Sequence, residues 1–240
     1  MGHPRILAAP IAFNEADRIG SVLERFKGVD VVDEVIVLDD CSEDGLRNIV
    51  EEKGFRLLSQ EKRSGVGAGI RRVIEYAREN HYDILVILAG NDKDRPNEIP
   101  RLVEPIVREG YDFVQGSRYL PGGEFGKMPL YRWVATRYIH PILFSIIAGR
   151  RITDSTNGFR AFRLSMFENP ELDINQSWLD GYELEPYLFY KAIKLGYKVK
   201  EVPATKIYPS KSLRYTKMKP VTGWWSILSP IIYLGLRIRK

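Results

Sequence analysis

Cysteine is almost absent from this chain, since Cys41 is the single example among 240 residues. One thiol excludes an internal disulfide framework and a cysteine-based zinc site, and it is typical of proteins in a reducing compartment. The opening residues, MGHPRILAAPIAFN, lack the cationic and then apolar pattern of a secretory signal, because their apolar residues already have the pattern of a strand. We therefore expect a cytoplasmic location.

Acidic residues are missing from the last part of the sequence. Residues 202–240 contain eight Lys or Arg and no Asp or Glu, so residues 1–201 carry a net charge of −3 within the total of +5. The basic excess belongs to the tail rather than to the whole surface. The sequence therefore does not favour a nucleic-acid partner.

The apolar segment in this tail is too short to cross a membrane. The stretch GWWSILSPIIYLGL, residues 223–236, has 14 residues and includes Pro230, whereas a spanning helix needs about 20 apolar residues. Its paired tryptophans and the flanking Arg237, Arg239 and Lys240 are typical of an interfacial helix near anionic lipid. The alternative is an apolar tail that docks on the protein's own core or in a homo-oligomer. We expect peripheral binding to the cytoplasmic face of a membrane.

The rest of the chain alternates between strand-like and helix-like patterns. Apolar runs at 6–13, 34–40, 55–60, 82–90 and 111–119 predict strands, and helical spacing at 15–27, 43–54, 67–80 and 96–110 predicts helices between them. Such alternation favours an α/β fold with a mostly parallel sheet and helices on both faces. The length fits one domain, which we place at residues 1–215, followed by the tail at 216–240.

The alternation ends after Tyr119. LPGGEFGKMP, residues 120–129, has three glycines and two prolines, which predicts a surface loop, either a lid over a site or an ordinary connection. YRWVATRYIHPILFSIIAG, residues 131–149, is a strongly apolar helical segment interrupted by Pro141. We expect it in the core or on a membrane surface.

Adjacent carboxylates at a strand end predict a ligand site. VIVLDDCSEDG ends a strand in Asp39 and Asp40, and Ser42 or Asp44 is expected to cap the next helix. Capping does not account for Asp39 and Asp40, which can accept from ribose hydroxyls or base N–H groups. The glycines of RSGVGAGIRR, residues 63–72, permit close approach to a phosphate, although a tight turn without a ligand is the commoner reason for such a run.

Seven segments in order resemble glycosyltransferase family 2, whose members have the GT-A fold: PIAFNE, DDCSEDG, GVGAG, NDKDRP, GSRY, DSTNGFRAF and KAIKLGYKVKEVP. The likeness covers residues 5–215 and is strongest to polyprenyl-phosphate sugar transferases of the dolichyl-phosphate mannose synthase type. The resemblance implies a UDP- or GDP-linked sugar donor, inversion at the anomeric carbon, and a Mg²⁺ or Mn²⁺ ion on the diphosphate. The implied acceptor is a polyprenyl phosphate at the membrane surface.

The resemblance also implies roles for single residues. The positions that match nucleotide-binding residues are Pro10, Asn14, Glu15, Asp39, Asp40, Gly65 and Gly67. Arg118 and Arg132 match basic positions that face the donor sugar or the acceptor phosphate. Asp154 and Arg160 match an acceptor-side motif of the family.

The acidic segment AGNDKDRP departs from the family pattern. Alignment on Pro96 places Ala-Gly-Asn, residues 89–91, where an Asp-Ala-Asp metal motif is expected. We therefore predict a weaker metal site at Asn91 and Asp92. In it, Lys93 takes over part of the charge neutralisation on the diphosphate.

The acceptor decides whether a base is needed. A polyprenyl phosphate is an anion at neutral pH, so positioning and charge stabilisation by Arg118 and Lys93 are expected to carry the rate. A saccharide hydroxyl requires a base, and Asp154 is the candidate. A nucleotidyltransferase and an inactive nucleotide-binding module are further alternatives. Asp94 is expected to cap the helix that opens at Pro96.

Overall fold

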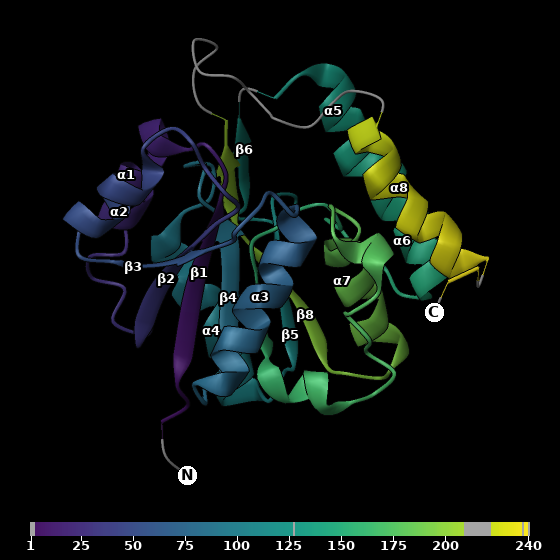
Figure 1. The fold of residues 1–240 in the computed structure, drawn as a ribbon. Coiled ribbons are helices and arrows are strands. Elements are labelled where there is room, and N and C mark those ends of the chain that lie inside the picture. Colours follow the sequence, from purple (N-terminus) through teal and green to yellow (C-terminus); the bar gives the residue numbers. More distant parts are fainter. Residues whose placement is uncertain (1–2, 127, 209–221, 237, 240) are drawn as a thin grey trace.

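A seven-stranded sheet forms the centre of the molecule, with helices packed on both of its faces (Figure 1). The computed structural model describes residues 3–126, 128–208, 222–236 and 238–239. In spatial order the strands are β3 (Arg56–Ser59), β2 (Glu34–Asp39), β1 (Ile6–Ala12), β4 (Ile84–Ala89), β7 (Arg160–Arg163), β5 (Phe113–Ser117) and β8 (Val199–Pro203).

The middle strands β1 and β4 are buried on both faces of the sheet. They pair in parallel with Ala8 opposite Val86, and almost all of their side chains are buried. Continuous apolar runs are what a parallel sheet covered on both faces requires. The runs predicted as strands at 6–13 and 82–90 are therefore confirmed.

The helices divide between the two faces. One face is covered by α1 (Ala16–Glu24), α2 (Leu46–Glu52) and α4 (Ile99–Glu109), and the other by α3 (Val66–Glu79) and α7 (Leu184–Lys194). Each helix turns an apolar stripe toward the sheet, as helical spacing of apolar residues predicts. The predicted mostly parallel sheet with helices on both faces is confirmed.

One strand of the sheet runs against the others. β7 is antiparallel to both β4 and β5, whereas the remaining described pairs in this sheet are parallel. The sequence does not predict this strand, because GFRAFR carries Arg160 and Arg163 in place of a clean apolar pattern. Arg160 is nevertheless buried, over the ring of Phe113.

The segment at 120–129 is not wholly a loop. Residues 124–126 form β6 (Glu124–Gly126), which pairs in parallel with β9 (Thr205–Ile207) in a separate two-stranded sheet. The prediction of a loop is therefore wrong for these three residues. This small sheet brings residues 205–208 to the carboxyl ends of the central strands.

The apolar segment after this loop is helical throughout. α5 (Leu130–Val134) continues through a π-helical turn, Ala135–Ile139, into α6 (His140–Ala148). Pro141, which has no backbone N–H, comes two residues after the π-helical turn, and the helical path continues through it. Large apolar side chains on this segment are exposed, among them Leu130 and Ile146.

The C-terminal helix α8 (Thr222–Gly235) lies beside α6 and α7 (Figure 1). Ile231 and Leu234 are buried in the core, while Trp225 and Leu236 are exposed. The tail therefore docks on the protein and still presents apolar groups to solvent. The predicted domain boundary at 215/216 lies outside the described residues. Within the parts of the chain that the structure describes, no helix has the length and apolar character that crossing a bilayer requires.

Candidate active site

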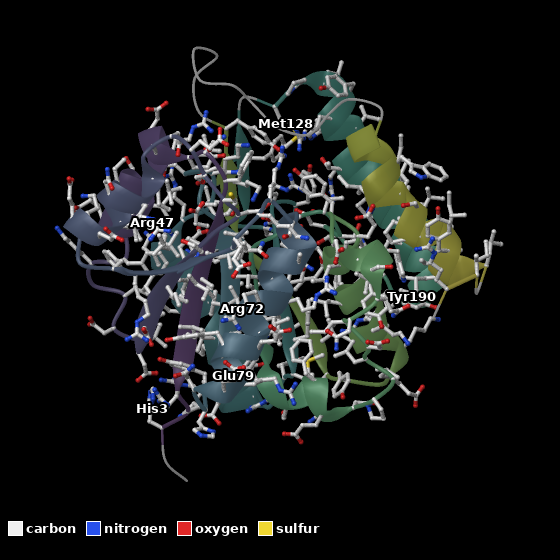
Figure 2. The ribbon with its side chains drawn as sticks, in the orientation of Figure 1. His3, Arg47, Arg72, Glu79, Met128 and Tyr190 are labelled. Atoms are coloured by element: carbon white, nitrogen blue, oxygen red, sulfur yellow. The ribbon has the colours of Figure 1, made fainter. Side chains whose placement is uncertain are left out.

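A cavity of about 320 Å³ opens at the carboxyl ends of β1 and β4. Ile11 and Ala12 at the end of β1 and Ala89 at the end of β4 line it. Thr136 also lines the cavity, and its Oγ1 lies 3.7 Å from Sδ of Met128. Figure 2 labels Met128 at this end of the molecule and His3 and Glu79 at the opposite end. The cavity thus lies where open α/β sheets bind ligands.

The cavity wall is strongly cationic. Among the described residues, seven basic side chains line it, namely Arg18, Arg63, Lys93, Arg118, Arg132, Arg160 and Lys206, against the three acidic side chains of Glu15, Asp40 and Glu185. Confining like charges beside apolar walls raises the positive potential inside the cavity. The site therefore suits an anionic ligand.

Asp40, at the end of β2, forms hydrogen bonds with the start of the glycine motif, residues 63–72. Its carboxylate accepts from the backbone N–H groups of Ser64, at 2.8 Å, and Gly65, at 3.0 Å, and from Nε2 of Gln60, at 2.9 Å. Asp40 is buried and also lines the cavity. Its carboxylate thus shapes the wall through the backbone amides that it binds.

Two other predicted nucleotide-binding residues build the turn behind this wall. Oδ1 of Asp39 accepts from the Ser42 amide at 2.9 Å, and Oδ1 of Asn14 accepts from the Glu43 amide at 2.9 Å. Neither residue lines the cavity, nor does the buried Pro10. Glu15 does line it, with its carboxylate 2.7 Å from Arg18.

The two glycines of the loop differ in what surrounds them. Gly65 lines the cavity, has a left-handed φ of +98°, and faces the carbonyl of Asp180. A Cβ on Gly67 would lie 2.0 Å from the carbonyl oxygen of Leu179 and 2.6 Å from that of Gly181. Gly67 therefore permits close packing of α3 against residues 179–181, and the structure places it outside the cavity lining. This packing role of Gly67 differs from both alternatives that the sequence offered, contact with a phosphate and a tight turn without a ligand.

Arg118 and Asp154 form a buried ion pair at the end of β5. Nε of Arg118 donates to Asp154 at 2.7 Å and its Nη2 donates at 2.8 Å, while both side chains are almost fully buried. Burial alone would raise the pKa of Asp154, but the charge and hydrogen bonds of Arg118 outweigh it and lower that pKa. Arg118 lines the cavity and Asp154 does not. The predicted base is therefore held behind the arginine.

Lys93 has two basic neighbours in the cavity lining, Arg132 and Lys206, and we call these three residues the cation cluster. Nζ of Lys93 lies 4.7 Å from the ring centroid of Tyr208, and the guanidinium of Arg132 lies 5.3 Å from it. Burial and the charges of Lys206 and Arg132 lower the pKa of Lys93 to about 7. All four residues line the cavity.

Asp94 holds one member of this cluster. Its Oδ1 accepts from Nζ of Lys206 at 2.6 Å, and its Oδ2 accepts from the Ala89 amide at 3.0 Å. The prediction that Asp94 caps the helix at Pro96 is wrong, because the buried carboxylate turns back to the strand end and to Lys206. No side-chain cap is present at that helical turn.

The acidic segment does not fit a metal ion. Asp92, a predicted ligand, forms an ion pair with Arg25 and lies outside the cavity lining. Asn91 does line the cavity, where its Oδ1 is buried without a hydrogen-bond partner, but this oxygen is neutral. Among the described residues no group of three or more His, Cys, Asp or Glu could hold a metal ion. Divalent Mg²⁺ and Mn²⁺ prefer carboxylate oxygens, which this segment directs elsewhere.

Two further side chains complete the wall toward α7 and α8. Arg160 lies 3.3 Å from Glu185, and both line the cavity. His140 sits behind the wall, where its Nε2 donates to the Ile227 carbonyl of α8 at 3.1 Å and its Nδ1 accepts from Ser155 at 2.6 Å. This tautomer follows because a carbonyl can only accept.

Sequence reasoning missed several lining residues. Arg18, Arg63, Lys206 and Tyr208 belong to the cavity, yet none of them was predicted as a site residue. Arg63 is the first residue of the glycine motif RSGVGAGIRR, so the sequence could have indicated it. Lys206 and Tyr208 reach the site only because β9 pairs with β6, and no local pattern indicates this pairing.

A mostly parallel sheet with a cationic cavity outside the carboxyl ends of its strands defines an α/β protein whose cavity suits an anionic ligand. The particular family follows from comparison with known proteins. The family described as Glycosyl transferase family 2 matches residues 11–170, and the chain belongs to it. The predicted family and the assignment as a glycosyltransferase are confirmed.

Several named proteins are similar along most of the chain. Undecaprenyl-phosphate mannosyltransferase of Micrococcus luteus is 28% identical over 210 residues, which is 84% of this chain and 83% of that protein. Polyprenol monophosphomannose synthase of Mycolicibacterium smegmatis is 27% identical over 89% of this chain and 81% of its own. Dolichyl-phosphate hexose transferase of Haloferax volcanii is 27% identical over 95% and 92%.

The fold is shared with a solved enzyme. Glucosyl-3-phosphoglycerate synthase from Mycobacterium tuberculosis, in a crystal structure with Mn²⁺, UDP and glucosyl-3-phosphoglycerate, superposes with a TM-score of 0.67. It is 21% identical and covers 98% of this chain and 79% of that chain. A structure of that enzyme with phosphoglyceric acid gives a TM-score of 0.69 at 22% identity, with 98% and 79% covered. The likeness shows that the GT-A fold is common to both.

Proposed function

We propose that this glycosyltransferase moves a hexosyl group from a nucleoside diphosphate sugar to a polyprenyl phosphate, with inversion at the anomeric carbon. The observation that carries the proposal is the cationic cavity, which borders a surface of exposed apolar side chains. A polyprenyl phosphate joins an anionic head to an apolar chain, so it needs both features. The names of the relatives from Micrococcus and Mycolicibacterium agree with this acceptor class.

The donor nucleotide is assigned to the side of the cavity near β1 and β2. Asp40 and Gly65 form the wall there, and Glu15, Arg18 and Arg63 line it. Arg63 already lies 4.1 Å from the ring centroid of Phe13, so a flat cationic and aromatic surface is present for a base or ribose. Asn14 and Asp39 act from behind this wall by binding backbone amides of the turn after β2, Gly67 acts through the close packing of α3, and Pro10 is a buried residue of β1. This assignment follows from their contacts.

The acceptor phosphate is assigned to Arg118 and Arg132. An oxygen of the phosphate attacks the anomeric carbon, and the bond from that carbon to the diphosphate oxygen breaks with its electron pair left on the diphosphate. One negative charge thus moves from acceptor to leaving group, and no proton needs to be removed. Positioned cations stabilise this charge in a cavity of low dielectric. Arg160 lies deeper and holds Glu185 in the wall.

Transfer to a saccharide hydroxyl is the second candidate, and the site favours it less. That reaction needs a base beside the acceptor oxygen. Asp154, the candidate base, has no exposed side-chain surface and is held by Arg118. An inactive nucleotide-binding module is also less favoured, because the cavity keeps its full set of basic side chains.

The exposed apolar surface is assigned to the membrane interface. Leu130 on α5 and Ile146 on α6 are 73% and 71% exposed, and Trp225 on α8 is 54% exposed. Arg150 and Arg151 follow directly after α6 and are exposed, which adds attraction to anionic lipid. We propose peripheral binding at the cytoplasmic face, with this surface placing the cavity at the level of the lipid phosphates.

Turnover with defined substrates tests the function. Purified protein is mixed with UDP- or GDP-linked hexoses and undecaprenyl phosphate in detergent, and release of the nucleoside diphosphate is measured. We expect release from at least one donor that depends on the lipid phosphate. Release that needs a saccharide acceptor instead, with none from the lipid phosphate, would contradict the proposal.

A further inference from the structure

Among the described residues, the cavity around the cation cluster has more basic than acidic side chains in its lining. Lys93 and Lys206 are only 6% and 9% exposed, and burying two ammonium groups together is costly without nearby anions. Asp94 is ion-paired with Lys206, and the carboxylate of Glu15, which attracts Lys93, also binds Arg18. The seven cations and three acids of the cavity lining leave a positive excess that an anionic ligand balances.

One member of the cluster, Lys93, lies in the loop after β4, where the family pattern gives metal-binding carboxylates. The loop after β4 turns Asp92 toward Arg25 and Asp94 toward Lys206. The residues of this loop that line the cavity are Asn91, whose amide is neutral, and Lys93. A left-handed backbone at Asp92, with φ of +60°, accompanies this reversal of the usual acidic arrangement.

We propose that the cation cluster binds the donor diphosphate directly and neutralises the charge that develops on it, in the position where a carboxylate-held metal ion is expected. The inference rests on the proposed function, because the diphosphate is the leaving group of that reaction. When the bond to the anomeric carbon breaks, its electron pair stays on the diphosphate oxygen. Lys206 supplies positive charge there, Lys93 adds its own because a bound phosphate favours its protonated form, and Arg132 extends the charge toward the acceptor. Asp94 positions Lys206 and does not touch the ligand.

Calorimetric titration with UDP and with GDP tests this inference. Each nucleotide is titrated into the wild-type protein in excess EDTA and again with Mn²⁺. The variants are Lys93→Met, which removes the charge at similar volume, Lys93→Arg, which restores it, and the double variant Asp94→Asn/Lys206→Met, which removes an ion pair without leaving a lone buried carboxylate. Lys200→Met is the matched control, since this lysine pairs with Glu109 and does not line the cavity.

We expect wild-type protein to bind one nucleotide in EDTA with an affinity less than about tenfold below that in Mn²⁺. Lys93→Met and the double variant should lose about tenfold or more in affinity, because each lacks one charge-assisted contact to phosphate. Lys93→Arg should recover most of it, and Lys200→Met should bind as wild type does. UMP and GMP serve as ligands without the second phosphate, and their affinities should fall less in Lys93→Met.

The outcomes separate the inference from the proposed function. If neither UDP nor GDP binds wild-type protein in either condition, the proposed function is overturned. If a nucleotide binds only with Mn²⁺, or binds Lys93→Met as tightly as wild type, the direct role of the cluster is overturned while the function stands. Circular dichroism shows whether each variant is folded, and an unfolded Lys93→Met leaves the double variant and the EDTA comparison to decide.

Discussion

At the scale of single residues, Asp40 joins stability to ligand binding. Its carboxylate accepts from Ser64, Gly65 and Gln60. Asp40→Ala should therefore lower the free energy of unfolding by about 1–3 kcal/mol, since three half-buried donors lose their acceptor. The same change should weaken UDP or GDP binding, because the loop that lines the cavity is released. Urea unfolding and calorimetry measure the two effects.

A matched carboxylate at the other end of the sheet serves as the control for Asp40. Asp33 accepts from the Ile6 amide at 2.6 Å, at the amino end of β1. Asp33→Ala should also reduce stability but should leave nucleotide affinity at the wild-type value. Unchanged nucleotide affinity in a folded Asp40→Ala protein would show that this strand end does not serve the ligand.

His140 makes stability depend on pH. Burial lowers the pKa of His140 to about 4, whereas an unfolded histidine has a pKa of about 6.5. Between these values the unfolded chain binds a proton that the folded protein does not, so stability falls as pH falls. Its charged neighbours, Asp154 and Arg118, are opposed in sign and act weakly on it.

The change in unfolding free energy with pH tests this contribution. Between pH 6.5 and 5 we expect His140 to account for a loss of up to about 2 kcal/mol. His140→Gln should show a flatter dependence in urea unfolding over that interval. His3→Gln, at an exposed position, is the control and should follow wild type. Parallel curves for wild type and His140→Gln would contradict the assignment.

At the scale of elements, the packing of α3 against residues 179–181 depends on Gly67. A methyl group there would overlap two backbone carbonyls. Gly67→Ala should destabilise the protein by about 1–3 kcal/mol, because the helix start must shift. Gly20, inside α1, meets only the flexible end of Lys53 and a methyl of Ile49, so Gly20→Ala should be neutral or stabilising by up to about 1 kcal/mol. Equal unfolding midpoints for the two variants would refute this account.

Elements that rest on local apolar patterns were predictable from the sequence, whereas elements that rest on contacts between distant residues were not. β1, β2 and β4 were predictable because burial on both faces demands local apolar runs. β7 was not, because its buried Arg160 depends on Glu185, which is distant in the sequence. The same difference applies to the residues of the site. Asp40 and Lys93 could be predicted because they come just after predicted strands. Lys206 reaches the cavity through the pairing of β6 with β9, and its ion pair orients Asp94, so neither position could be predicted from local sequence.

At the scale of the whole molecule, the cavity and the exposed apolar surface lie on connected elements. Arg132 of α5 and Ile227 of α8 line the cavity, while Leu130 and Trp225 of the same helices are exposed. Docking of these helices on a bilayer would therefore present the cavity to a lipid phosphate without any spanning segment. The helical path through the π turn keeps α5 and α6 in one continuous surface.

Vesicle flotation with surface variants tests this docking. Ile146→Glu and Leu130→Glu each place a charge where an apolar group would enter the interface, and each should weaken binding to anionic vesicles by about tenfold or more. Val107→Glu is the matched control, because Val107 is exposed on α4, across the sheet from this surface, and flotation should not change. Full flotation of both variants would refute membrane docking here. If wild type does not float and sedimentation shows a dimer that Ile146→Glu dissociates, the surface joins two copies of the chain instead.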